Sequence, residues 1–146
     1  LDLNGCYWVA DLFMSSVSKF IRNLEYLNLG HSNITFHTRE HIIRLPKIRA
    51  LDVGCTNINQ KDIGAICNAN PRIEKIALYG LSGSAVIIGR GVLTKGKMHV
   101  IGDLLKNCTH LNVHACDRLD DNSLDRFLKL QFVNIWNVKG ISEKTK

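Results

Sequence analysis

Two cysteines and two histidines, Cys108, His110, His114 and Cys116, lie within nine residues of one another. Zinc binds four such side chains at the corners of a tetrahedron. The residues between them alternate as in a strand, which places His110 and His114 on one face, about 13 Å apart at about 3.3 Å per residue. Cys108 then points to the opposite face and Cys116 falls in the following turn. The four cannot converge on one ion, so we predict no metal site here.

Two further patterns resemble chemical sites without completing them. His37 and His41 have helical i,i+4 spacing but would need further ligands, so we interpret them as surface residues. Residues 91–98 fit the start of a phosphate-binding loop, G-x-x-x-x-G-K. Met98 stands where Ser or Thr would hold magnesium, and no acidic magnesium-binding strand follows. We therefore predict neither a nucleotide site nor any cofactor.

The five cysteines show no catalytic arrangement and no disulfide framework. A nucleophilic cysteine needs a neighbouring base and a group that orients it, and the sequence shows neither. We therefore predict a protein that is not an enzyme. An odd number of cysteines without dense paired spacing is typical of reduced thiols, which favours the cytoplasm or nucleus. The cysteines are Cys6, Cys55, Cys67, Cys108 and Cys116.

The composition is basic, with a net charge of +6 and a pI near 9.2. This charge permits acidic partners, including nucleic acid. The basic residues are scattered, with one local enrichment at Arg90, Lys95, Lys97 and Lys106. These four residues define an alternative function, a basic surface for nucleic acid or another acidic partner. The sequence has no apolar run of about 18 residues, so we predict no membrane span, and the oligomeric state stays open.

The elements that would position these residues follow from a repeat. Residues 24–34 and 48–58 share apolar residues at places 1, 4, 6 and 11 and begin 24 residues apart. The same L-x-x-L-x-L frame predicts six short strands, whose central residues are separated by 26, 24, 25, 35 and 22 residues. The strand segments are 1–6 (incomplete), 24–29, 48–53, 73–78, 108–113 and 130–135.

This frame resembles the leucine-rich repeat family, in which units of 20–29 residues stack into a curved solenoid. The Leu-Asn-Leu-Gly-His-Ser-Asn-Ile-Thr and Leu-Asp-Val-Gly-Cys-Thr-Asn-Ile-Asn runs, together with Cys6 and Cys116, are similar to the cysteine-containing repeats of F-box and Zyg-11/Zer-1 type ubiquitin-ligase receptors. The resemblance implies an α/β solenoid with short parallel strands on the concave side and helices on the convex side. It also implies a protein-binding role, such as substrate recognition for a ubiquitin ligase.

Helical spacing between the strands predicts outer helices at residues 11–21, 61–67, 98–106 and 121–128. The long gap before the fifth strand predicts a glycine-rich insertion at about 81–97, with a degenerate strand at 85–88 as the alternative. We expect residues 1–146 to form a single domain. Because the chain opens partway through a strand, we expect it to be a fragment of a longer protein.

Strand alternation assigns places 4 and 6 to the core and places 3, 5 and 7 to the concave solvent face. Exposed aromatic side chains on a rigid surface are typical of residues that dominate binding at protein interfaces. The alternative is that Phe132 and Trp136 pack beneath a further repeat or cap. The predicted partner-binding residues are Tyr26, Lys75, Tyr79, His110, Asn112, His114, Phe132, Asn134 and Trp136.

Overall fold

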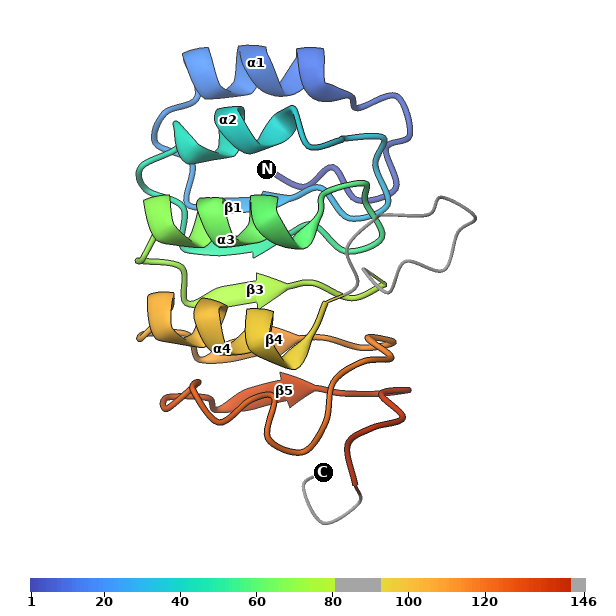
Figure 1. Ribbon diagram of the computed structural model, residues 1–146. Coiled ribbons are helices and arrows are strands. Elements are labelled where there is room, and N and C mark those ends of the chain that lie inside the picture. The colour runs from blue at the N-terminus through green and yellow to red at the C-terminus, as the bar shows by residue number, and fades with distance from the viewer. Residues whose placement is uncertain (81–92, 143–146) are drawn as a thin grey trace.

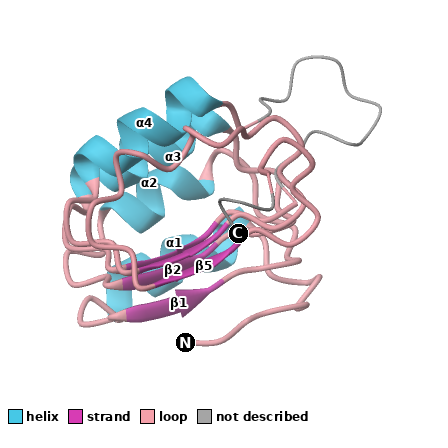
Figure 2. Cartoon of the chain, turned by 90° about the horizontal axis from the view of Figure 1, so that it is seen from below, coloured by secondary structure: helices cyan, strands magenta, loops and turns pink. Residues whose placement is uncertain are grey.

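The computed structural model describes residues 1–80 and 93–142. The strands form one parallel sheet in chain order, β1-β2-β3-β4-β5, and the helices stack beside one another in the same order (Figure 1). Figure 2 shows the helices together on one side of the sheet. The predicted α/β solenoid is therefore confirmed. The elements are α1 (Asp11–Phe20), β1 (Tyr26–Asn28), α2 (Thr38–Ile43), β2 (Ala50–Asp52), α3 (Gln60–Ala69), β3 (Lys75–Ala77), α4 (Lys95–Leu104), β4 (His110–Asn112) and β5 (Phe132–Asn134).

The register of the sheet repeats without a shift. Leu27 pairs with Leu51, Leu51 with Ile76, Ile76 with Leu111, and Leu111 with Val133. These are five of the six strand centres that the repeat predicted. The incomplete first unit contributes a bridge between Asp2 and Asn28, so all six units enter the stack in the predicted register.

Places 4 and 6 of the second to sixth units point into a continuous apolar core between the sheet and the helices, whereas Leu1 at place 4 of the first unit is exposed. Leu27, Leu29 and Val53 are fully buried in it, and α3 contributes Ile63 and Ile66 from the opposite side. Truncating one such residue to Ala leaves a cavity and costs about 2–5 kcal/mol. The alternation predicted from the sequence thus separates the core face from the concave face.

A tight turn ends every strand at the same place. The residue at place 8 has a positive φ in all six units, and only two of the six are glycine. A left-handed conformation costs a non-glycine residue about 1 kcal/mol or more, so the stack imposes this turn against local preference. The residues are Gly5 (φ 71), His31 (56), Cys55 (52), Gly80 (63), Ala115 (56) and Asn137 (57).

Side chains at place 9 support the same turn, as expected for Ser32 and Thr56. The hydroxyls of Ser32 and Thr56 donate to the carbonyl oxygens of Leu29 and Val53, each at 2.7 Å. Cys116 is buried at the equivalent place, and its Sγ donates to the carbonyl oxygen of Leu78 at 3.5 Å. These three side chains therefore satisfy backbone carbonyls at the turn, whereas the apolar Val138 is buried at place 9 of the last unit.

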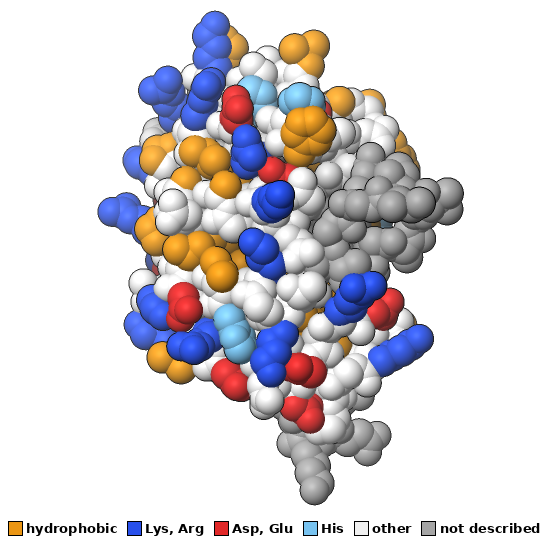
Figure 3. Space-filling view, in the orientation of Figure 1, with side chains coloured by type: hydrophobic (Ala, Val, Ile, Leu, Met, Phe, Trp, Pro, Cys, Tyr) orange, Lys and Arg blue, Asp and Glu red, His pale blue; other side chains and the backbone are white. Residues whose placement is uncertain are grey.

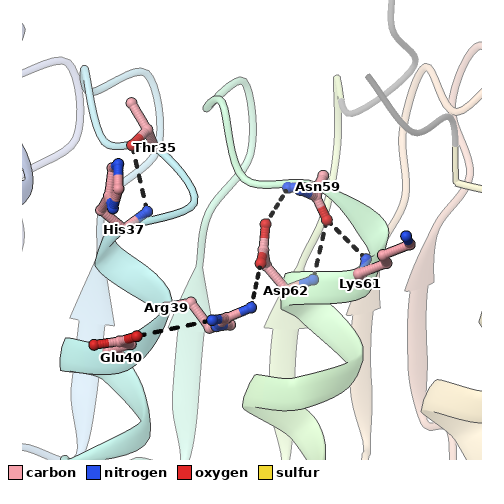
Figure 4. Close-up of polar contacts among 7 residues, drawn as sticks. All are labelled: Thr35, His37, Arg39, Glu40, Asn59, Lys61 and Asp62. Atoms are coloured by element: carbon pink, nitrogen blue, oxygen red, sulfur yellow. Dashed lines mark hydrogen bonds and ion pairs between the residues drawn. The ribbon is translucent and has the colours of Figure 1, made fainter. Parts of the chain in front are cut away.

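The helices are linked through polar side chains at their amino ends (Figure 4). Asn59 caps α3 by accepting hydrogen bonds from the backbone N–H groups of Lys61 and Asp62, and the Asp62 carboxylate accepts one from the N–H of Asn59. Arg39 of α2 donates to the same carboxylate at 3.2 Å. Asp62 is almost fully buried, and these donors stabilise its charge.

Three of the four predicted outer helices are present, as α1, α3 and α4. The fourth prediction was wrong, because residues 121–128 form successive turns. Asp120 and Ser123 fix these turns, since the Ser123 hydroxyl accepts from the Asp120 N–H at 2.8 Å and donates to the Asp120 carboxylate at 2.9 Å. Such local bonds compete with a helix, and only 22 residues separate the last two strand centres.

The boundary of the expected insertion also changes. Residues 95–97 were assigned to it but form the first turn of α4, which begins at Lys95 rather than Met98. Residues 81–92, with the alternative strand at 85–88, lie outside the described part of the chain.

We predict that Gly80→Ala lowers the free energy of unfolding by about 2 kcal/mol. Gly80 has a positive φ, and an added Cβ would lie 2.4 Å from the Sγ of Cys55. The control is Gly64→Ala in α3, where an added Cβ meets nothing within 4 Å. That change is expected to raise stability by about 0.5–1 kcal/mol. Urea unfolding measures both, and equal effects of the two substitutions would contradict the proposed turn constraint.

Candidate functional site

A shallow hollow of about 530 Å³ crosses the concave face of the sheet. Its floor is low because the small residues Ala50 and Ala77 occupy concave positions on β2 and β3. Tyr26 lies at one end and Phe132 at the other, and the two side chains are 46% and 57% exposed. The hollow can therefore receive apolar side chains between two aromatic walls.

The polar groups of the hollow are of two kinds. At its rim, Arg49 forms an ion pair at 2.6 Å with Glu74, which is not among the residues that line this hollow. On its floor, Lys75 of β3 is exposed and makes no ion pair within residues 1–80 and 93–142. The amino group of Lys75 is thus available to an acidic group on a bound molecule, and its role in binding a partner stays a prediction.

The Asn and Asp side chains at place 5 have a structural role that the sequence analysis did not predict. The Oδ1 atoms of Asn28, Asp52, Asn112 and Asn134 each accept a hydrogen bond from the backbone N–H two residues later, at 3.0, 2.9, 3.2 and 3.1 Å. This is the bond of an Asx-turn. The recurrence of Asn or Asp at place 5 was the available signal. The side-chain oxygens of Asn112 and Asn134 are therefore already used within the chain.

Tyr79 corrects one of the predicted contacts. It was expected to be an exposed anchor, but it is only 9% exposed. A Cβ added to Gly54 would lie 2.4 Å from the ring carbons of Tyr79, and a Cβ added to Gly30 would lie 2.7 Å from its hydroxyl oxygen. Tyr79 therefore fills the space that two consecutive place-7 glycines leave open. That pair of glycines was the sequence signal for its burial.

The Tyr79 hydroxyl also hydrogen-bonds to the carboxylate of Asp52. Burial raises the pKa of Asp52, although the hydrogen bonds from Gly54 and Tyr79 oppose that rise. Burial and the nearby Asp52 charge raise the pKa of Tyr79 to about 12. The hydrogen bond between Tyr79 and Asp52 thus links two neighbouring units beneath the concave surface.

Aromatic and histidine rings stack along the last units on the concave face. The rings of Tyr79 and His114 are 5.4 Å apart and nearly parallel, and His114 lies 5.4 Å from Trp136. His110 stacks on Phe132 at 5.9 Å. Trp136 is 72% exposed, so no described residue covers it. Its role in binding stays a prediction.

The cysteines and histidines that the sequence analysis considered as metal ligands or nucleophiles do not form a chemical site in the described residues. The Sγ of Cys108 donates to the carbonyl oxygen of His110 at 3.5 Å, and burial raises the pKa of Cys108 to about 11 and that of Cys67 to about 12. Such thiols stay protonated and are poor nucleophiles. His37 is exposed and stacks on Phe36, whereas His41 is half-buried. Among residues 1–80 and 93–142, no group of three or more His, Cys, Asp or Glu could hold a metal ion.

The local basic enrichment does not form one surface. Lys95 lies at the start of α4 and pairs with Asp120 at 3.4 Å, whereas Lys106 lies beyond its end and pairs with Asp103 at 3.1 Å. A helix of this length separates its ends by about 15 Å. Lys97 is half-buried, and Arg90 lies outside the described residues.

Repeated strand, left-handed turn and outer helix together define a leucine-rich-repeat solenoid. Among solved structures, the fold is similar to that of an internalin from Listeria monocytogenes, with a TM-score of 0.53 and 16% sequence identity. The match covers 83% of this chain and 36% of the internalin chain. No protein-family model and no curated protein sequence matches this chain. No helix in the described ranges is long and apolar enough to cross a membrane.

We predict that Tyr79→Phe lowers the free energy of unfolding by about 1 kcal/mol near pH 8, because Asp52 loses a hydrogen bond. The pKa of Tyr79 is raised in the folded state, so the unfolded chain ionises first, near pH 10. The contribution of the wild-type hydroxyl is therefore lost as the pH rises from about 10 to about 12. Urea unfolding across this range should show the difference between the two proteins narrowing. A constant difference would contradict the raised pKa.

Proposed function

We propose that the chain is a protein-binding module that captures a partner in the hollow of its concave face. The observation that carries this proposal is the pair of exposed aromatic side chains, Tyr26 and Phe132, standing at the ends of an alanine-floored hollow on a hydrogen-bonded sheet. Exposed aromatic residues on a rigid backbone lose little entropy when they bind. No catalytic step is needed, and we propose a non-enzymatic role.

The geometry favours an elongated partner segment that crosses the strands. The hollow extends from β1 to β5, so a bound segment would contact several units at once. Apolar side chains of the segment would contact Ala50 and Ala77, and an acidic group would meet Lys75. Trp136 extends the aromatic surface beyond the hollow, toward the carboxyl ends of the strands.

The finer proposal is that this module recognises substrates for a ubiquitin ligase. It rests on the similarity of residues 27–35 and 51–59 to repeats of such receptors. We propose a cytoplasmic or nuclear location, which the thiols of Cys6, Cys55, Cys67 and Cys108 support because none of the four is in a disulfide. The alternative function, a nucleic-acid surface at Lys95, Lys97 and Lys106, is less well supported than protein binding, because these three residues do not form a common patch.

We predict that Phe132→Ala and Trp136→Ala each weaken binding of a protein segment at least about 30-fold, as expected for hot-spot residues. The probes are peptides selected on the wild-type protein from a displayed random library, and titration measures their dissociation constants. Both side chains are largely exposed, so the free energy of unfolding should change by less than about 1 kcal/mol.

The matched controls are Phe20→Ala and Leu128→Ala, whose side chains are 74% and 79% exposed outside the concave face. They should leave the dissociation constants unchanged. Equal losses in the control and concave-face variants would contradict binding in the hollow. Loss of stability in Phe132→Ala and Trp136→Ala would instead assign these rings to packing.

The ligase proposal needs a separate test in cells. A reporter fused to a selected peptide should fall in abundance when the full-length protein is expressed, and a proteasome inhibitor should restore it. The Phe132→Ala variant should leave the reporter unchanged. A reporter whose abundance does not respond to the wild-type protein would contradict the ligase role without affecting the binding role.

A further inference from the structure

The positive charge of the chain is concentrated on one edge of the solenoid, although it is scattered in the sequence. Five loops lead from the convex side into the strands: residues 21–25, 44–49, 70–74, 105–109 and 129–131. They carry seven basic residues and two acidic ones, a net charge of +5 out of +6 for the whole chain. The basic residues are Arg22, Arg44, Lys47, Arg49, Arg72, Lys106 and Lys129, and all are exposed.

Each unit from the second to the sixth contributes at least one of these residues. The parallel register places the five loops side by side, about 4.8 Å apart, so the cations form a row about 20 Å long. Figure 3 shows Lys and Arg side chains along this edge, at the left of the view. A hollow of about 260 Å³ lies within this row. It is lined by Glu25, Lys47, Arg49, Arg72, Glu74 and Asn107.

Most of these basic residues form no ion pair with another residue in the ranges 1–80 and 93–142. Arg49 pairs with Glu74 and Lys106 with Asp103. Lys47 and Arg72 make no ion pair or hydrogen bond in the described part of the chain, although both line the hollow on the edge. A row of unpaired cations attracts a partner that carries several negative charges in a line.

We infer that this row, the basic edge, binds an acidic segment of the partner protein that the concave face holds, and the inference rests on the proposed function. The basic edge adjoins the concave hollow, because Glu25 and Arg49 line both hollows. A polypeptide can place carboxylates along the edge and apolar side chains against Ala50 and Ala77. Single-stranded nucleic acid is the rival occupant, because Tyr26 and Phe132, which directly follow two of the five loops, could stack on its bases.

The test compares two charge reversals of equal size. In the double variant Lys47→Glu/Arg72→Glu both changes lie on the basic edge. In the control Lys61→Glu/Arg118→Glu both lie near the opposite ends of the strands, where the residues are also exposed. The probe is a labelled oligoglutamate peptide, titrated at low and at physiological salt. Thermal melts of both variants confirm that they fold.

The edge variant should lose about tenfold in affinity for oligoglutamate, because two cations of the row become anions that repel its carboxylates, and the control should change less than threefold. Equal losses in the two variants would overturn the inference. The inference would also be overturned if an oligothymidylate of equal charge bound more tightly than oligoglutamate and only the edge variant lost this binding. Phe132→Ala should weaken the selected peptides but not oligoglutamate, which separates failure of the basic edge from failure of the concave face.

Discussion

The backbone hydrogen bonds between successive units are the constraint on which the rest of the structure depends. At place 6, Leu29 donates to the carbonyl oxygen of Asp52, and Val53 donates to that of Ala77, at 2.8 and 3.1 Å. At place 8, His31 and Cys55 continue the same ladder into the turn. Because these bonds fix each unit one strand spacing from the next, every place of the repeat becomes a row across the molecule.

The rows explain why residues far apart in the sequence act together. The place-4 and place-6 rows form the core, and the place-3 row brings Tyr26 and Phe132 to the two ends of one hollow although more than a hundred residues separate them. The loop row collects the basic residues in the same way. Small residues leave space in a row. The space above Ala50 is part of the concave hollow, and the space above Gly54 is filled by the ring of Tyr79.

The sequence was sufficient to predict features that follow from the period of the repeat. The strand centres, the core face and the outer helices at α1, α3 and α4 depend on spacing alone. Residues 121–128 have apolar spacing typical of a helix, but Asp120 and Ser123 form local bonds that the periodicity does not report. The burial of Tyr79 and the basic edge depend on contacts between units. They could be predicted only by comparing the same place, including the loop places, in neighbouring units.

A crystal structure of the chain bound to a peptide selected on it would show directly whether the concave hollow is the binding site. We expect the peptide to cross the strands, with an apolar side chain over Ala50 or Ala77 and contacts to Tyr26 or Phe132. A peptide bound on the convex helices or at either end of the solenoid, with the concave hollow empty, would contradict this expectation.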